Sequence, residues 1–329
     1  RKRSLLTHWL VQRLGADQED AALLRYIAKR LLSALITIVV LITVTFALMR
    51  AIPGSPFIKG EQRMPPEVLQ RIEEKYGMDK PLFQQYLTYL KNIARGDFGI
   101  SFKRSDVAVN DIIDRGFPIS ARVGGAAVVV SLLIGLGLGI VSAVRKGGLL
   151  DRVSMVLATV GISIPTFVTA VLLLYLFAGV WNILPTYGLA TWRHYILPVA
   201  CLSLSPVAYI ARMTRSSMLE VMQQDYIRTA RAKGLREAVV ILRHGLRNAI
   251  LPVVTYLGTL VAALLTGSFV VERLYAIPGI GRYFVDSIGA RDYNVILGLT
   301  VFFGIFVVLC NILVDILYVL IDPRIKMTE

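Results

Sequence analysis

The stretch Val123–Val144, VGGAAVVVSLLIGLGLGIVSAV, holds no charged residue over 22 positions and lies between Arg122 and Arg145. About 20 apolar residues in an α-helix are needed to cross the roughly 30 Å hydrocarbon core of a membrane. A single segment in hydrocarbon must also pair its own backbone N–H and C=O groups, and a helix does so. The stretch therefore predicts a membrane-spanning helix.

Other uncharged stretches of similar length extend this prediction along the chain: Leu31–Met49, Val153–Trp181, Asn248–Val271 and Tyr293–Val314. A sixth, Tyr195–Ala211, is shorter and contains Pro198 and Pro206, which taken alone would also allow a re-entrant segment. The whole chain is 55% hydrophobic and only 18% charged, which argues against a soluble enzyme and against a disordered chain. We therefore predict an all-α integral membrane protein with six transmembrane helices.

Lysine and arginine counts predict the orientation of these spans. Seven precede the first span, three lie in Arg145–Arg152, eight in Arg212–Arg247 and two after the last span, against one and three in the opposite short loops. The positive-inside rule then places both termini and the basic loops in the cytoplasm, and the long segment Ile52–Pro118 outside. The net charge of +14 is explained by basic loops beside anionic lipid, without nucleic acid.

The predicted organisation has four parts. Residues 1–30 form a cytoplasmic amphipathic segment lying on the membrane surface, and residues 31–51 hold the first span. Residues 52–118 form an external helical loop, with helical patterns after Pro65 and Pro81 and a turn at Asp97-Phe98-Gly99. Residues 119–329 form the membrane core, with spans two to six and the cytoplasmic loop 212–247.

No catalytic motif is present in the sequence. A P-loop, an H-E-x-x-H zinc motif and a C-x-x-C pair are all missing, and the three histidines, His8, His194 and His244, fall in separate predicted regions. Cys201 and Cys310 lie inside apolar runs, where a structural thiol is expected. We predict no catalytic residue, no metal site and no cofactor bound by this chain.

The glycines of Gly135-Leu136-Gly137-Leu138-Gly139 lie midway along an apolar span and have no preceding strand. This position does not fit a dinucleotide-binding turn. Small residues four apart let a second helix approach closely, so Gly135 and Gly139 predict a helix-packing face.

The cytoplasmic loop contains Asp225–Leu235, DYIRTARAKGL, followed by an apolar-periodic piece that runs to Pro252. This pattern predicts two short helices hinged at Gly234. Such an exposed unit, basic on one side and apolar on the other, suits a groove on a cytoplasmic partner. An amphipathic loop lying on lipid headgroups remains an alternative at this point.

Eight motifs in order resemble the membrane permeases of ABC importers, and specifically the B-type of the dipeptide/oligopeptide/nickel branch. They are Pro53-Gly54-Ser55-Pro56, Gly96-Asp97-Phe98-Gly99-x-Ser101, Ser163-x-Pro165-x-Phe167, Leu184-Pro185-Thr186-Tyr187-Gly188, Arg228-Thr229-Ala230-Arg231-Ala232-Lys233-Gly234-Leu235, His244-Gly245-Leu246-Arg247-Asn248, Glu272 with Pro278-Gly279-Ile280-Gly281, and Asp322-Pro323-Arg324. Arg228 stands where the general coupling-loop motif has Glu.

The resemblance implies half of an import pore in the bacterial cytoplasmic (inner) membrane, crossing it several times. The implied partners are a second homologous permease, two cytoplasmic ATPases that bind ATP and Mg, an external solute-binding protein and membrane lipid. The implied ATPase-docking residues are Asp225, Arg228, Thr229, Ala230, Arg231, Lys233, Gly234, Leu235, His244 and Arg247.

Polar or kinking residues inside the spans are candidates for the translocation path: Ser163, Pro165, Ser203, Ser205, Thr255, Thr259, Thr266 and Ser268. Polar backbone and hydroxyl groups beside a proline are tolerated where they face water or protein. Each hydroxyl could equally bond back to its own helix. Asp315 lies near the end of the last span, where pairing with a basic neighbour is favoured over contact with the solute.

The solute class stays open between two readings. A di- or oligopeptide importer is preferred, and a nickel or other small-solute importer of the same architecture is the alternative. A channel or a membrane-embedded enzyme is a more distant alternative, and it would function without ATPases.

Overall fold

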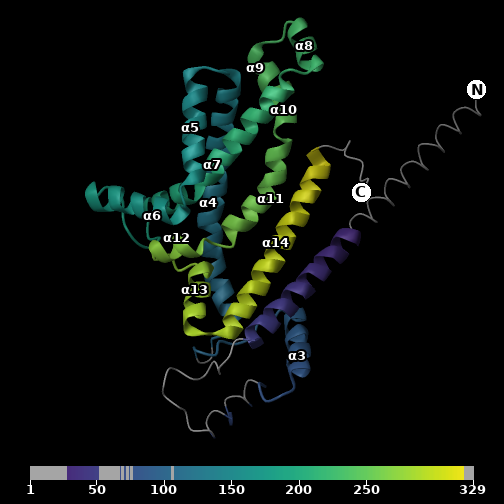
Figure 1. Cartoon of the computed structure of the whole chain (residues 1–329), viewed down its shortest axis with the longest axis vertical. Helices are drawn as coiled ribbons and strands as arrows, with labels where there is room; N and C mark the ends of the chain where they lie inside the picture. Colours follow the sequence, from purple (N-terminus) through teal and green to yellow (C-terminus); the bar gives the residue numbers. More distant parts are fainter. Residues whose placement is uncertain are drawn as a thin grey trace, which may run out of the picture.

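The computed structural model describes residues 28–51, 67, 70, 71, 74, 77–104 and 107–321, with residues 315–321 described by their backbone alone (Figure 1). The predicted N-terminal amphipathic segment lies almost wholly outside the described residues. The same holds for most of the helical pattern after Pro65, for the side chain of Asp315 and for the motif Asp322-Pro323-Arg324.

The described part of the chain is all-helical, and its one β-bridge is an isolated antiparallel pair between Ile100 and Ala108. A first helix, Ala28–Ala51, precedes the labelled elements. These are α3 (Leu82–Ala94), α4 (Val109–Val144), α5 (Leu149–Ser163), α6 (Thr166–Leu173), the π-helical segment η1 (Leu174–Val180), α7 (Arg193–Val221), α8 (Asp225–Ala232), α9 (Glu237–Val239), the π-helical η2 (Val240–Gly245), α10 (Leu246–Ala249), α11 (Leu251–Leu265), α12 (Phe269–Leu274), α13 (Ile280–Ala290) and α14 (Tyr293–Ile321).

The long helices run between two ends of the molecule, one carrying α8 and the other carrying α3 (Figure 1). Within the described residues, the most extensive helix pairing joins α4 to α7, and the main core forms where α4, α7 and α11 meet. The first helix crosses beside α14, where Leu41 contacts Gly304. It reaches α3 through the Phe46 and Tyr86 rings, 5.5 Å apart.

Five helices of the described chain are long and apolar enough to cross a membrane. A sixth crossing is counted only if α5 and the α6–η1 helix form one broken span, because the two are bent by 104°. The prediction of an all-helical membrane fold is confirmed, and the span count is five or six.

The helix that contains the second span starts earlier than the predicted span. Helix α4 begins at Val109, fourteen residues before the predicted start at Val123, and it runs through Pro118 without a break. Arg115 and Arg122 ended the uncharged stretch in the sequence, yet at about 1.5 Å per residue the 36-residue helix is longer than the hydrocarbon core. The last ten residues of the predicted external loop therefore belong to α4.

The third span, predicted within Val153–Trp181 with Ser163 and Pro165 as interrupting residues, is divided at those residues. It begins at Leu149, and α5 ends at Ser163, before Pro165. Ile164 has an extended backbone at φ −85° and ψ 122°, because a residue before proline is sterically kept from the helical region. The chain turns sharply there into α6.

The fourth span, predicted at Tyr195–Ala211, is a continuous helix, and the alternative of a re-entrant segment does not apply. Helix α7 continues from Arg193 to Val221 through both Pro198 and Pro206. Its packing against α4 and α5 outweighs the helix-breaking tendency of the two prolines. Because α7 reaches Val221, the loop predicted at 212–247 starts ten residues later than expected.

The fifth span is also divided. Helix α11 ends at Leu265, and α12 starts at Phe269, where Ser268 Oγ accepts a hydrogen bond from the backbone N–H of Val271 at 3.4 Å. The Thr266–Ser268 break interrupts the helix within a stretch that the sequence alone predicts as continuous, and Leu251–Leu274 still counts as one of the five long apolar helices. The Thr266 and Ser268 hydroxyls at this break therefore both bond to nearby backbone groups.

The glycine face predicted on α4 lies against α7. A Cβ built on Gly139 would lie 2.5 Å from Thr214 Cβ and 2.7 Å from the Ala211 carbonyl oxygen, and one on Gly135 would lie 2.8 Å from Ile210 Cβ. Real Cβ atoms do not pack at such distances. The close approach of the α4 and α7 backbones therefore requires glycine at these two positions.

We expect Gly139→Leu to separate α4 from α7 and to lower the membrane abundance and the thermal unfolding temperature of the purified protein. Overpacking a close contact costs about 1–3 kcal/mol or more. The matched control is Gly137→Leu on the same helix, because a Cβ at Gly137 meets no atom within 4 Å. Equal abundance and equal unfolding temperatures for both variants would rule out a close-packed glycine face.

Candidate functional site

The segment between α7 and α11 forms an exposed unit at one end of the molecule (Figure 1). Helix α8 ends at Ala232, and Gly234 adopts a left-handed backbone with φ +75°, with its N–H donating to the Arg231 carbonyl at 2.9 Å. The chain then re-enters helix at Glu237. Two short helices hinged at Gly234 are therefore present, as the sequence predicts.

One face of α8 packs inward. Ile227 and Ala230 are buried in a small cluster with Val240 of η2, and Met222 packs against it. Ala230 is 5% exposed, so it is wrongly placed among the residues that would touch a partner. Its small side chain instead lets α8 pack closely against η2.

The opposite face of α8 is open. Asp225, Arg228 and Thr229 are exposed, and Arg228 Nη1 lies 3.5 Å from Asp225 Oδ1. The Thr229 hydroxyl donates to the Asp225 carbonyl at 3.0 Å. This short polar face is the part of the unit that a neighbouring protein could contact.

A forked ion pair closes the turn around Gly234. Arg231 donates to Glu237 through Nη2 at 2.6 Å and through Nε at 3.2 Å. These hydrogen bonds keep the pKa of Glu237 below its usual value. A bidentate arginine–carboxylate pair fixes relative orientation, so it holds α8 and α9 at a set angle across the hinge.

The remaining predicted docking residues lie around this hinge and along the second helical piece. Lys233 and Leu235 are exposed on either side of Gly234, Arg247 is exposed on α10, and His244 is half-buried on η2. The Asn248 amide donates to the Tyr226 hydroxyl at 2.9 Å and so ties α10 to α8. The whole unit is compact.

A buried ion pair below this unit was not identified from the sequence. Asp151 of α5 accepts two hydrogen bonds from Arg215 of α7, at 2.6 and 2.8 Å. Asp151 also accepts from the Ser142 hydroxyl of α4 at 2.5 Å and from the backbone N–H of Gly147 at 2.9 Å. Three helices therefore meet at one carboxylate, and one of them, α7, leads directly into α8.

The candidate path residues fall into three groups by exposure. Ser163, Pro165, Thr255 and Thr259 are exposed, and Ser205, Thr266 and Ser268 are half-buried. Ser203 is only 4% exposed and donates to the Ala200 carbonyl at 3.2 Å, so it lies in the core of the bundle and lines no path in this conformation.

Most of these hydroxyls have partners on their own helix. Ser163 donates to the Thr159 carbonyl, Thr255 to the Leu251 carbonyl and Thr266 to the Ala262 carbonyl. These three hydroxyls therefore bond back to their own helices, which is the alternative role considered for them in the sequence. Ser163 of α5 and both Thr255 and Thr259 of α11 are nevertheless exposed.

An aromatic pair that the sequence analysis overlooked lies between two of these helices. The rings of Tyr209 on α7 and Tyr256 on α11 have centroids 4.5 Å apart, and Tyr209 is 43% exposed. Ser205 lies one turn before Tyr209 on the same face of α7, and Thr255 is adjacent to Tyr256. The aromatic pair therefore lies between α7 and α11, on helices that also carry candidate path hydroxyls.

Two polar clusters brace the end opposite α8. Glu272 is buried, accepts from the Ser120 hydroxyl of α4 at 2.5 Å and from the backbone N–H of Arg282 at 3.1 Å, and packs against Gly279. Asp292 is buried as well and accepts from the Ser101 hydroxyl and from the backbone N–H of Phe102. The motifs quoted for the resemblance around Gly96–Ser101 and Glu272–Gly281 therefore hold this end together.

No group of three His, Cys, Asp or Glu side chains able to hold a metal ion occurs among the described residues. Cys201 is buried, and its Sγ lies 3.3 Å from the Thr166 carbonyl oxygen, so the thiol joins α7 to α6. The predicted structural role for this thiol fits its position.

A bundle of five or six apolar spans with an exposed helix–glycine–helix unit at one end has the architecture of a multi-pass membrane protein. The chain belongs to the family described as binding-protein-dependent transport system inner membrane component, whose model matches residues 135–327. The N-terminal model of the same family matches residues 23–124. Permease subunits of this family are not themselves catalytic.

Curated relatives extend over nearly the whole chain. The dipeptide transport system permease protein DppB of Bacillus subtilis (strain 168) is 50% identical over 92% of this chain and 98% of its own length. The oligopeptide transport system permease protein OppB of Escherichia coli (strain K12) is 45% identical over 92% of this chain and 100% of its own length.

Solved structures support the fold. The inward-facing MetNI methionine ABC transporter matches with a TM-score of 0.54 at 20% identity, covering 64% of this chain and 96% of that chain. An amino acid ABC transporter solved with histidines matches with a TM-score of 0.51 at 16% identity, covering 64% and 94%.

Proposed function

We propose that this chain forms half of the translocation path of an ATP-driven importer of di- and oligopeptides. The single observation that carries the proposal is the exposed α8–Gly234–α9 unit, which continues directly from the central helix α7. The names of the DppB and OppB relatives support peptides as the solute class.

The proposed assembly has five subunits besides the solute. A second, homologous permease completes the path, two cytoplasmic ATPases bind ATP and Mg, and an external solute-binding protein delivers the peptide. We place the α8 end in the cytoplasm and the α3 end outside, on the charge counts of the loops. The exposed face of α8, with Asp225, Arg228 and Thr229, contacts an ATPase groove.

The proposed mechanism is alternating access. Closure of the ATPase pair on ATP moves the docked unit as one body, because the Arg231–Glu237 pair fixes the angle between α8 and α9. Helix α7 moves with it because only three residues separate α7 from α8. The Asp151–Arg215 pair passes this motion to α5, and Ser142 links the same carboxylate to α4. The spans then reopen toward the binding protein, and hydrolysis resets them.

The proposed path runs along the exposed side of α5, α7 and α11, with Thr255 and Thr259 beside the Tyr209–Tyr256 pair. A peptide backbone cannot enter hydrocarbon with its polar groups unpaired, so it needs a route lined with water or hydroxyls. Aromatic faces beside those hydroxyls give apolar peptide side chains a surface to pass along.

The orientation is tested by reporters at two positions. We expect a reporter fused after Glu329 to be cytoplasmic and one inserted near Gly60 to be external. Accessibility to a membrane-impermeant label on intact cells gives the measurement. The opposite labelling would invert the topology and remove α8 from the ATPase side.

The solute class is tested in an amino-acid auxotroph that depends on a dipeptide for the missing amino acid. We expect deletion of the gene to stop growth on the dipeptide and to leave growth on the free amino acid unchanged. Nickel uptake is measured in the same strains. Normal dipeptide growth together with lost nickel uptake would favour the alternative metal importer.

A further inference from the structure

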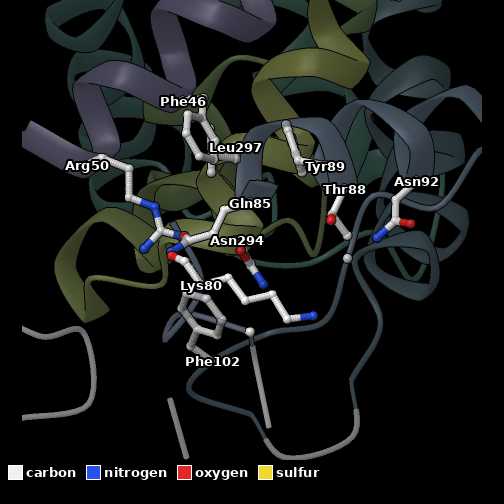
Figure 2. Close-up of a pocket in the computed structure, with 12 residues that line it drawn as sticks. Phe46, Arg50, Lys80, Gln85, Thr88, Tyr89, Asn92, Phe102, Asn294 and Leu297 are labelled. Carbon is white, nitrogen blue, oxygen red and sulfur yellow. The ribbon is translucent and has the colours of Figure 1, made fainter. Parts of the chain in front are cut away.

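A pocket of about 140 Å³ lies at the α3 end, away from the proposed path (Figure 2). That volume is several times the roughly 10–15 Å³ that one water needs. Side chains enter it from three helices: the first helix, α3 and α14. Its lining includes Phe46, Arg50, Lys80, Gln85, Tyr89 and Leu297.

The pocket lies at the level where two spans end. Arg50 is the last residue but one of the helix Ala28–Ala51, and Leu297 lies in the second turn of α14, which begins at Tyr293. Phe46, one turn deeper than Arg50, and Leu297 give the pocket an apolar side. The ends of apolar spans lie near the headgroup region of a membrane, so the pocket is at the depth of lipid phosphates.

Two cations line this pocket without a carboxylate partner. No Asp or Glu among the described residues forms an ion pair within 4.0 Å of Arg50 or Lys80, and the Arg50 guanidinium lies over the Phe46 ring, 5.4 Å from its centroid. Figure 2 shows Arg50 reaching into the pocket from the first helix. Clustered cations without an anion favour a negatively charged ligand.

Two buried polar atoms in the pocket wall also lack a partner. The Tyr89 hydroxyl and Gln85 Oε1 are both buried, and neither atom takes part in a hydrogen bond. Gln85 Nε2 donates to the Met78 and Lys80 carbonyls at 3.0 and 2.6 Å, which fixes the amide and leaves Oε1 as an acceptor. Buried polar groups are costly when unpaired, so these atoms indicate a missing ligand or water.

Burial raises the pKa of Tyr89, so its hydroxyl stays protonated and can donate. The wall therefore combines a planar guanidinium, an ammonium and a phenol as donors with one amide acceptor. Guanidinium groups bind phosphate oxygens in pairs, and an ammonium binds them as a point charge.

We propose that this pocket binds a phosphate group through Arg50, Lys80 and the Tyr89 hydroxyl, with Gln85 Oε1 accepting from a neighbouring donor of the same ligand. A phospholipid headgroup supplies such a donor as a hydroxyl or ammonium, and free phosphate supplies it as a P–OH group. The inference does not depend on which solute the importer carries.

The first experiment measures retained lipid. The assembled importer is purified with the full-length chain, washed in detergent and examined by native mass spectrometry. We expect the wild type to retain at least one phospholipid that the Arg50→Gln/Lys80→Gln variant loses. Lys91→Gln is the matched control, because Lys91 is an exposed cation on α3 that does not line the pocket.

The second experiment titrates inorganic phosphate into the delipidated importer against chloride of equal ionic strength and follows the unfolding temperature. A ligand that binds the folded state raises that temperature by mass action. We expect the Arg50→Gln/Lys80→Gln variant to need at least about tenfold more phosphate for the same rise in unfolding temperature, because two charge-assisted contacts are lost. Tyr89→Phe keeps the ring and should weaken the response several-fold, which separates binding from misfolding.

The two experiments distinguish the sources. Lipid retention that depends on Arg50 and Lys80 identifies a headgroup phosphate, and a phosphate response without such retention identifies the free ion. Equal lipid retention and an equal phosphate response in the wild type, Arg50→Gln/Lys80→Gln and Lys91→Gln would overturn the proposal.

Discussion

Gly234→Val is expected to reduce peptide uptake by about 5–30-fold at wild-type membrane abundance. Gly234 sits at φ +75°, and a residue with a Cβ pays roughly 1–2 kcal/mol in this left-handed region. The space around it is open, so the backbone alone is strained. We expect this strain to raise the free energy of the docked state, which lowers the equilibrium constant for docking by about 5–30-fold. Co-purification of the ATPases should fall with uptake.

Two matched variants separate this effect from general damage. Gly234→Asn should keep most of the uptake, because asparagine tolerates the left-handed region. Gly188→Val has the same type of strain at φ +83°, also in open space, before the other end of α7. It should leave ATPase association intact. Normal uptake and normal ATPase association for Gly234→Val would contradict the coupling role of the loop.

Arg215→Ala is expected to lower the stability of the importer by about 3 kcal/mol and to weaken coupling. It removes both hydrogen bonds to Asp151 and leaves that carboxylate buried without its cation. Breaking a buried ion pair costs about 3–5 kcal/mol, and the lower end applies because the Arg215 side chain is 26% exposed. The measurements are the unfolding temperature of the purified importer and the ratio of peptide transported to ATP hydrolysed.

The double variant Asp151→Asn/Arg215→Ala should recover part of the lost stability, because it removes the buried charge as well as its partner. Arg212→Ala is the matched control on α7, since Arg212 contacts the Thr159 hydroxyl at 3.2 Å and pairs with no described carboxylate. An unfolding temperature for Arg215→Ala as high as that of Arg212→Ala would show that the pair does not join these helices.

The apolar spans and the hinge at Gly234 could be predicted from the sequence because both depend on local properties. An uncharged stretch of about 20 residues is visible without knowing its neighbours. A glycine between two amphipathic pieces is likewise a local sign of a left-handed turn. The structure has helix on both sides of Gly234, at φ +75°.

Span boundaries depended on information that is not local. Arg115 and Arg122 hid the first fourteen residues of α4, since a charge can lie on a helix that extends past the hydrocarbon. Pro206 suggested a break that the packing around α7 overrides. Pro165 breaks its span, and nothing in the local sequence distinguishes it from Pro206.

The polar clusters could not be found from one sequence because their members are far apart along the chain. Asp151 and Arg215 are 64 positions apart, and Ser120 and Glu272 are 152 apart. Each residue alone looks like a surface or loop position. The inward-facing side chain of Ala230 was missed for a related reason: the side of α8 that packs depends on η2, which follows later in the chain.

ATP-driven peptide uptake into proteoliposomes tests most directly whether this chain is half of a coupled import path. The vesicles contain this permease, its homologous partner and the ATPases, with the solute-binding protein and a labelled peptide on the side of α3 and ATP on the side of α8. We expect accumulation that requires ATP, requires the binding protein and falls about 5–30-fold with Gly234→Val. Uptake that proceeds equally without ATP, or that is unchanged by Gly234→Val, would contradict the proposed coupling.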